Sequence, residues 1–179
     1  MYHSNYHSTL LEDTIEKIYF ILNIYHPYQL DILEIADLMN INVHFIEISS
    51  RTYKNEIIID SRLSYEEQWE DFAHELCHIL FHYGNQILHL NSLYLVYQEW
   101  KANNFALHFC VPTFMLKETL FIHNIKNIPE AIPLIKSYYN VTDEIAIKKL
   151  IHFRNQLQMT KIQEQLNKLN KLKNPYQKI

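Results

Sequence analysis

The scarcity of glycine is the feature that most limits what this chain can fold into. Gly84 is the only glycine among 179 residues, and there are only five prolines. Tight two-residue turns between antiparallel strands depend on glycine, so a sheet-rich fold with many such turns is not expected. Collagen-like and flexible low-complexity chains are excluded by the same counts. Because 48% of the residues are hydrophobic, the chain can bury one core of ordinary size.

Apolar residues at helical spacing predict helix over most of the chain. Two short β-branched segments, 42–48 and 56–60, predict neighbouring strands, with a turn-rich connection between them. We therefore expect an α+β fold in which a small antiparallel β-sheet packs beside a helical bundle, followed by a helical C-terminal segment. Further helices are expected over residues 9–25, 31–39, 94–110, 113–121, 130–139 and 142–155.

The segment 64–83 carries the strongest helix signals. Ser64 and Glu67 form a capping-box pattern, and further acidic residues lie near the positive end of the helix dipole. Gly84 follows as the expected C-cap. We expect a helix of about five turns here.

This helix contains His-Glu-Leu-Cys-His at residues 74–78. Residues four apart share a helix face, so His74 and His78 could hold one zinc ion, while Glu75 could reach a water on the zinc without ligating the metal. Zinc lowers the pKa of that water toward about 7. Glu75 could then act as the general base of peptide hydrolysis and return the proton to the leaving amine. The alternative is a helix with merely solvated histidines.

A catalytic zinc needs a third protein ligand and one open position. The extended metzincin pattern would require glycine at position 81 and histidine at position 84, but the chain has Phe81 and Gly84. A glutamate from a following helix is the other solution, and Glu99 lies on the next predicted long helix, where small residues allow close approach to the motif helix. His89 and His108 remain competing ligands.

These residues resemble the ImmA/IrrE family of bacterial zinc metallopeptidases. His74-Glu75-Leu76-Cys77-His78 corresponds to the family's H-E-L-G-H motif, and residues 99–106 match its E-x-x-A-N-x-F-A motif, followed by Pro112. The resemblance covers about residues 30–155. It implies a mostly helical zincin-like core with one zinc ion per chain, held by His74, His78 and Glu99, with Glu75 as the general base. Another divalent metal could replace zinc, because this ligand set accepts several.

The resemblance also implies a function: cleavage of a helix-turn-helix repressor, which derepresses a mobile element, prophage or stress regulon. The alternative is a non-proteolytic, metal-holding regulator that sequesters a repressor or antitoxin partner. Glu75 argues against that alternative, because a purely structural site needs no base. Narrow specificity is a further expectation from the resemblance.

Some candidate residues have weaker support. Cys77 stands where the family has glycine, and we expect both Cys77 and Cys110 to pack in the core, since two cysteines are too few for a disulfide framework. Groups that could support the ligands or stabilise the oxyanion are His82, Tyr83, Tyr97 and His108, with Tyr94 and His89 as further candidates, and the sequence does not choose among them.

We divide the chain into a metallopeptidase domain (1–130), a helix-turn-helix-like segment packed on it (131–155) and a basic amphipathic tail (156–179). The tail carries five lysines and one glutamate, so its net charge is +4, and the rest of the chain sums to -8 against a total of -4. Because a DNA reader should show a basic footprint, direct nucleic-acid binding is not expected. The tail is expected to dock on the body or on a partner, and the alternative is a solvated helix with fraying ends.

The sequence shows no secretory signal and no apolar stretch near the about 20 residues that span a bilayer. We therefore expect a cytoplasmic protein that does not act on membranes. The strand at 56–60 could offer its edge to an extended substrate, because proteases often bind peptides by strand addition.

Overall fold

The first two α-helices begin where the sequence supplies capping groups. The computed structural model describes residues 6–81 and 92–173. Helix α1 (Leu10–Ile21) begins after Thr9, which forms a complete capping box with Glu12. Helix α2 (Ile32–Leu38) begins after Asp31, whose carboxylate accepts hydrogen bonds from two backbone amides of the first turn. A short 3₁₀ helix, η1 (Pro27–Gln29), lies between them.

Asparagine does at helix ends what glycine does in most proteins. Four asparagines have positive φ, between 49° and 58°, which is the left-handed region. They follow α1, α2, α5 (Thr113–Ile122) and α6 (Ile128–Tyr139), and Asn140 is the C-cap of α6. Asparagine tolerates this region better than other residues with a Cβ atom. The chain can therefore end its helices with so little glycine; the four residues are Asn23, Asn40, Asn124 and Asn140.

The sheet is mixed, and the prediction of an antiparallel sheet is wrong for one strand pair. Strands β1 (Asn42–Ile46), β2 (Arg51–Tyr53) and β3 (Glu56–Asp60) lie in the order β1-β3-β2. β2 and β3 form an antiparallel hairpin, whereas β1 pairs with β3 in parallel. The segment predicted as a connection between the two strands contains β2, and β2 is the strand that pairs antiparallel with β3.

This order also overturns the expectation that residues 56–60 form an edge. β3 is the central strand, so the edges of the sheet belong to β1 and β2. Ile57 and Ile59 of β3 are fully buried, as a central strand against a helix requires.

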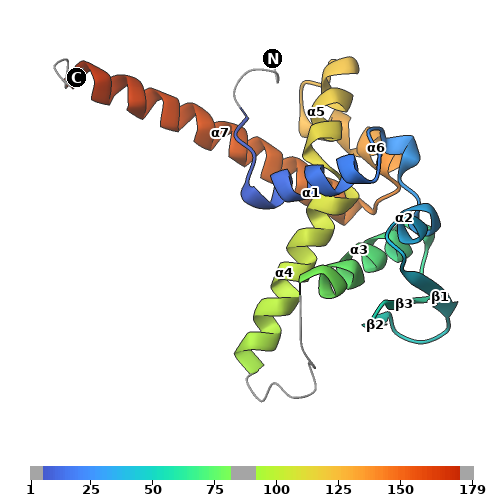
Figure 1. Cartoon of the computed structure of the whole chain (residues 1–179). Coiled ribbons are helices and arrows are strands. Elements are labelled where there is room, and N and C mark those ends of the chain that lie inside the picture. Colours follow the sequence, from blue (N-terminus) through green and yellow to red (C-terminus); the bar gives the residue numbers. More distant parts are fainter. Residues whose placement is uncertain (1–5, 82–91, 174–179) are drawn as a thin grey trace.

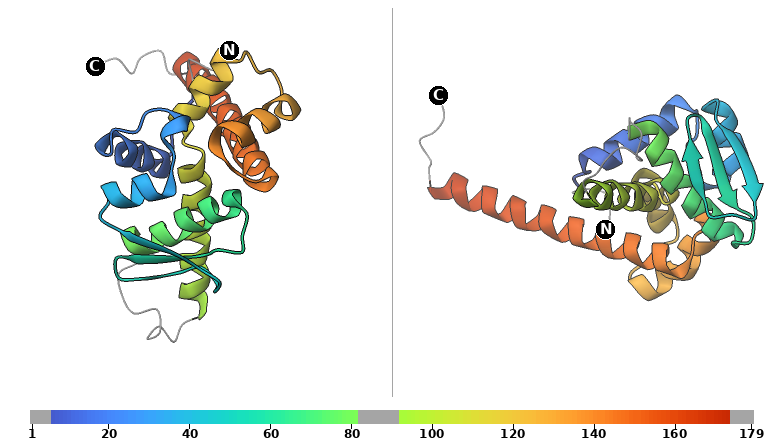
Figure 2. Two further views of the ribbon diagram at one scale, coloured as in Figure 1. Left: turned by 90° about the vertical axis from the view of Figure 1, so that its right-hand side faces the viewer. Right: turned by 90° about the horizontal axis from the view of Figure 1, so that it is seen from below.

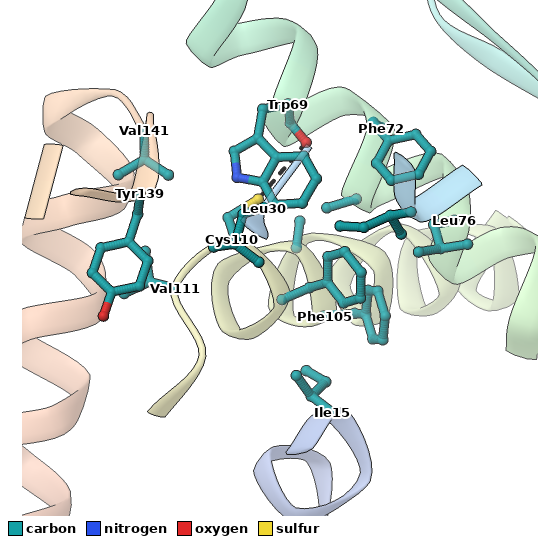
Figure 3. Close-up of a cluster of buried hydrophobic side chains, with 14 of the residues drawn as sticks. Ile15, Leu30, Trp69, Phe72, Leu76, Phe105, Cys110, Val111, Tyr139 and Val141 are labelled. Carbon is teal, nitrogen blue, oxygen red and sulfur yellow. Dashed lines mark hydrogen bonds between the residues drawn. The ribbon is translucent and has the colours of Figure 1, made fainter. Parts of the chain in front are cut away.

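Two long helices form the centre of the molecule (Figure 1). Helix α3 (Tyr65–Phe81) covers the sheet and makes its most extensive helix contacts with α4 (Ser92–Cys110). Trp69, Phe72 and Leu76 of α3 meet Phe105 and its neighbours of α4 in the core (Figure 3). The small buried residues Ala102 and Ala106 let the two helices approach closely. α3 and α4 thus hold the candidate site in a rigid frame.

The C-terminal segment is one long helix rather than two. Helix α7 runs without interruption from Asp143 to Lys173, so the predicted boundary at residues 155 and 156 falls inside it. Its first half packs on α6 and α4. Its second half extends away from the body as a single helix (Figure 2). The division into three segments stays a prediction.

One segment, Leu93–Ile122, is long and apolar enough to cross a membrane by length and composition. It comprises α4 and α5, which are separated at Val111 and Pro112. In the most apolar part of this segment, 67% is buried inside the fold. The expectation that no apolar stretch approaches the length of a membrane span is therefore wrong by length and composition. Most of this segment is nevertheless buried, as the core helices of a soluble protein are.

Candidate metal centre

The structure brings His74, His78 and Glu99 together at the contact between α3 and α4. The two Nε2 atoms of His74 and His78 are 3.1 Å apart. Glu99 places one carboxylate oxygen 3.2 Å from His74 Nε2 and the other 3.6 Å from His78 Nε2. One potential ligand atom from each side chain lies within 4.8 Å of the others. The four-residue spacing on α3 and the return of α4 produce this convergence.

Asn103 fixes the orientation of His74. Asn103 Oδ1 lies 3.0 Å from His74 Nδ1, one helical turn beyond Glu99 on α4. An amide oxygen can only accept, so this bond places the proton on Nδ1. The Nε2 lone pair of His74 is then directed at Glu99 and His78. Asn103 is the asparagine of the motif at residues 99–106, and its position four residues after Glu99 signals a shared helix face.

These donors fit a zinc ion. Ligand atoms at the usual 2.0–2.1 Å from a tetrahedral zinc are separated by about 3.3 Å. The two imidazole nitrogens are 3.1 Å apart and one Glu99 oxygen lies 3.2 Å from His74 Nε2, close to that separation. Two imidazole nitrogens and a carboxylate form the three-ligand set of a catalytic site, which leaves one position open. Glu99 is about half exposed, with 52% of its side chain accessible. The open side therefore faces solvent, where a substrate could enter.

Comparison with known proteins identifies the family of this chain. Residues 30–150 match the family described as Peptidase M78, IrrE N-terminal-like domain. The chain belongs to the Peptidase M78 family. This confirms the resemblance drawn from the two motifs, and it makes the protein a member of a metallopeptidase family.

Two proteins of Bacillus subtilis (strain 168) are similar to this member of the Peptidase M78 family over most of their length. Phage-like element PBSX protein XkdA is 38% identical over 173 residues, covering 92% of this chain and 83% of XkdA. Uncharacterized protein YqaB is 36% identical over 158 residues, covering 83% of this chain and 87% of YqaB. The chain is thus an ImmA/IrrE-like protein with a relative from a phage-like element.

Glu75 lies between His74 and His78 in sequence and is only 9% exposed. Burial, with smaller contributions from the nearby charges of Asp71 and Glu99, raises the pKa of the Glu75 carboxyl to about 7, although Arg51 opposes them. A carboxylate with such a pKa is a competent base at neutral pH. A bound cation would lower this pKa, because it stabilises the charged form.

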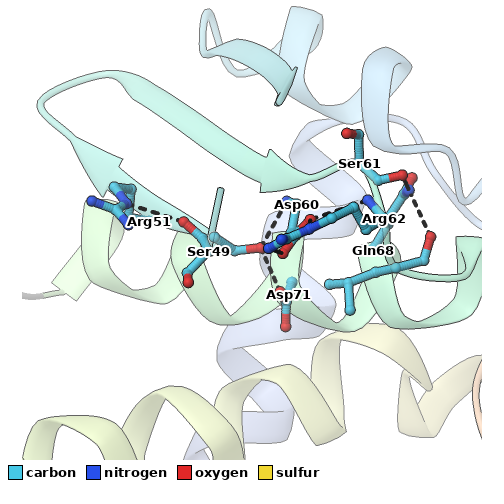
Figure 4. Close-up of polar contacts among 9 residues, drawn as sticks. Ser49, Arg51, Asp60, Ser61, Arg62, Gln68 and Asp71 are labelled. Carbon is cyan, nitrogen blue, oxygen red and sulfur yellow. Dashed lines mark hydrogen bonds and ion pairs between the residues drawn. The ribbon is translucent and has the colours of Figure 1, made fainter. Parts of the chain in front are cut away.

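The sheet is tied to α3 one turn before Glu75. Ser50 Oγ donates to Asp71 Oδ2 at 2.5 Å and accepts from the backbone amide of Asp60 at 3.0 Å (Figure 4). This link holds the start of β2 against the helix that carries the histidines. Arg51 of β2 is close enough to influence the pKa of Glu75, so the β2 edge of the sheet lies beside the candidate site.

Cys77 packs in the core, as expected from its position in place of the family glycine. It is 2% exposed, and burial raises the pKa of its thiol to about 12. The thiol therefore stays protonated at neutral pH and is a poor metal ligand. Cys110 is fully buried, and its Sγ lies 3.7 Å from the Trp69 carbonyl oxygen. Neither cysteine belongs to the cluster of His74, His78 and Glu99.

Of the other candidates, His108 and Tyr97 lie outside this cluster. His108 is 2% exposed and belongs to a separate buried group with Glu12, His152 and Lys149. Tyr97 is 54% exposed and stacks on Trp100, with no hydrogen bond to the three ligands in the described ranges. His82, Tyr83 and His89 lie outside the described residues.

The buried group around His108 is an ion-pair network that the sequence did not reveal. Lys149 donates to His108 Nδ1 at 2.7 Å and to Thr113 Oγ1 at 2.8 Å, and its Nζ lies 3.9 Å from Glu12 Oε1. Burial lowers the pKa of Lys149 to about 7, and burial together with Lys149 lowers that of His108 to about 3. Glu12, His108 and His152 could ligate a metal, but Lys149 already engages His108.

A cavity of about 410 Å³ lies away from this site, between the α5–α6 connection and α7. Its lining is mostly apolar and includes the charged residues Lys126 and Arg154. It contains no residue of the candidate metal centre.

Proposed function

We propose that this protein is a zinc-dependent endopeptidase, with His74, His78 and Glu99 as metal ligands and Glu75 as the general base. The observation that carries the proposal is the convergence of two imidazole nitrogens and a carboxylate next to a buried glutamate. Membership of a metallopeptidase family supports the same assignment.

The roles of the side chains follow from their positions. A bound zinc ion would acidify a water molecule and polarise the scissile carbonyl group. Glu75 accepts the proton of the attacking water and passes it to the leaving amine. Asn103 keeps the His74 ring in the orientation and tautomer that ligation requires. The burial of Glu75 favours proton transfer at neutral pH, because it brings the pKa of the carboxyl close to the pH of the medium.

We infer that the substrate is a helix-turn-helix repressor in the cytoplasm, and that its cleavage derepresses a mobile element, prophage or stress regulon. The similarity to a protein named for a phage-like element supports this inference. An extended segment of the substrate could pair with the outer edge of β2, which lies beside α3.

Metal analysis and a cleavage assay test the proposal together. We expect about one zinc per wild-type chain, and loss of that zinc in both His74→Ala and Glu99→Ala. Glu75→Gln should keep the metal and lose cleavage of a helix-turn-helix repressor that wild type cuts. Glu66→Gln, on the first turn of the same helix, is the matched control and should cleave normally.

The same variants separate the proteolytic function from sequestration of a repressor. If wild type binds the repressor and holds zinc without cutting it, the protein is a metal-holding regulator instead. If wild type cannot be loaded with a divalent metal, the metallopeptidase proposal is wrong.

A further inference from the structure

The second half of α7 leaves the body as a bare helix (Figure 2). Thr160, at 4% exposed, is the last buried side chain in the described part of α7, and its hydroxyl accepts a hydrogen bond from the His7 amide. From residue 161 to residue 170 every side chain is exposed except that of Glu164, which is half-buried. A helix that packs against nothing gains no stability from tertiary contacts, so this part of α7 calls for a partner.

Four large apolar side chains form one stripe along this helix. Their spacing of three, four and three residues places them on one face, as in the seam of a coiled coil. Each is substantially exposed, at 61%, 49%, 48% and 54% for Met159, Ile162, Leu166 and Leu169. We call these four residues the α7 stripe.

The residues bordering the α7 stripe are all neutral amides. In heptad terms the flanking positions are Gln158, Gln163, Gln165 and Asn170. Lys161 and Lys168 lie on the opposite face of the helix. A second identical helix can therefore approach the stripe without bringing like charges face to face. Lysines placed away from the apolar face also contribute less to binding an anionic lipid surface, where each gains from proximity.

The spacing of the α7 stripe along the sequence is symmetric about position 164. Two copies in antiparallel orientation would set Met159 against Leu169 and Ile162 against Leu166, twice over, as a two-fold axis requires. Charge favours this orientation. The segment 156–179 carries +4 and the remainder of the chain -8, so antiparallel helices direct each basic tail toward the acidic body of the other copy. Parallel helices would place two basic tails side by side.

From these observations we propose that a second copy of this chain covers the α7 stripe, with the two α7 helices antiparallel. The contact is short, so the dimer should form and dissociate with concentration in solution. It should weaken as salt is added, because part of its attraction is between opposite charges. None of the stripe residues belongs to the candidate metal centre, so dimerisation and metal binding can be measured independently.

Sedimentation equilibrium of the full chain tests the proposal. We expect a monomer–dimer equilibrium for wild type and dimerisation weakened by about tenfold or more in the double variant Ile162→Gln/Leu166→Gln. The matched control is Leu10→Gln/Ile21→Gln, which changes two residues of 83% and 79% exposure on α1 and should dimerise like wild type. Circular dichroism and zinc content, unchanged in both variants, would show that the fold is intact.

Cross-linking tests the orientation. Because Cys77 and Cys110 are buried, single cysteines added on α7 can report on the contact. A mixture of I162C and L166C chains should form disulfide-linked dimers faster than either variant alone. Faster linking of L166C with itself would overturn the antiparallel arrangement.

Two results would overturn dimerisation itself. One is a wild-type protein that stays monomeric at every concentration. If that monomer binds phosphatidylglycerol vesicles and Ile162→Gln/Leu166→Gln does not, a lipid surface and not a second copy covers the stripe. The other is a double variant that dimerises as strongly as wild type.

Discussion

At the scale of single residues, the candidate metal centre depends on which nitrogen of His74 carries the proton. Asn103 decides this by accepting from Nδ1. Asn103→Ala should therefore weaken zinc affinity by about 10- to 100-fold, because the ring loses its fixed tautomer and orientation. Competition with a chelator of known affinity measures the change. Asn104→Ala, the neighbouring residue on the same helix, should bind zinc like wild type, and equal losses in both variants would contradict this role.

The pKa of Glu75 predicts how cleavage depends on pH. Burial raises this pKa to about 7, and only the ionised carboxylate can accept a proton. Activity should therefore fall as pH decreases, with a midpoint at or below about 7, because a bound cation lowers the pKa of the nearby carboxyl. The measurement is kcat/KM as a function of pH. A rate that instead rises on acidification would show that Glu75 is not the base.

Much of the candidate site was predictable because its spacing is local. His74, Glu75 and His78 lie within one helical turn, so a helix is enough to align them. Glu99 required knowing that α4 returns against α3, which the motif resemblance implied. The network of Glu12, His108, Thr113 and Lys149 was missed because its members come from distant parts of the chain and form no motif.

At the scale of secondary-structure elements, the helices were largely predicted and the sheet was not. Helical periodicity and caps are local signals, whereas strand direction depends on which strands pair. β2 has only three residues, Arg51–Tyr53, within a polar stretch. Lys54, with φ of 55°, starts the tight turn to β3. This hairpin occupies one side of β3, so β1 pairs on the other side and in parallel.

The asparagine caps predict a specific ranking of substitutions. Asn140 ends α6 with φ of 50°. Asn140→Gly should leave stability unchanged or slightly higher, because glycine has no Cβ clash in this region. Asn140→Ala should cost about 1–2 kcal/mol, the penalty of the left-handed conformation for a residue with a Cβ atom. Urea unfolding measures both. Equal effects of the two substitutions would refute the argument.

The buried ion pair joins α1 to α7, and its two charges should be strongly coupled. Burial alone would raise the pKa of Glu12, but Lys149 and the hydrogen bonds from Thr113 and Thr9 lower it to about 2. Lys149→Met should cost about 3–5 kcal/mol, because it leaves a buried carboxylate unpaired. The double variant Glu12→Gln/Lys149→Met should recover much of that loss. Additive losses in denaturant unfolding would contradict the coupling.

The same pair sets an acid limit on stability. The folded-state pKa of Glu12 lies below its ordinary value of 4.5, so the unfolded chain binds the proton more readily. The stability contributed by Glu12 is thus fully present above about pH 4.5 and is lost as the pH falls toward about 2. In Glu12→Gln this part of the acid dependence should be missing.

At the scale of the whole molecule, the candidate metal centre and the α7 stripe occupy separate parts of the chain. The residues that build the centre lie on α3 and α4, whereas no described side chain beyond Thr160 is buried. A chain ending at Glu164 should therefore fold, bind zinc and unfold within about 0.5 kcal/mol of the wild-type monomer. It should fail to dimerise, because Leu166 and Leu169 are gone. Loss of zinc binding on truncation would instead mean that the end of α7 supports the core.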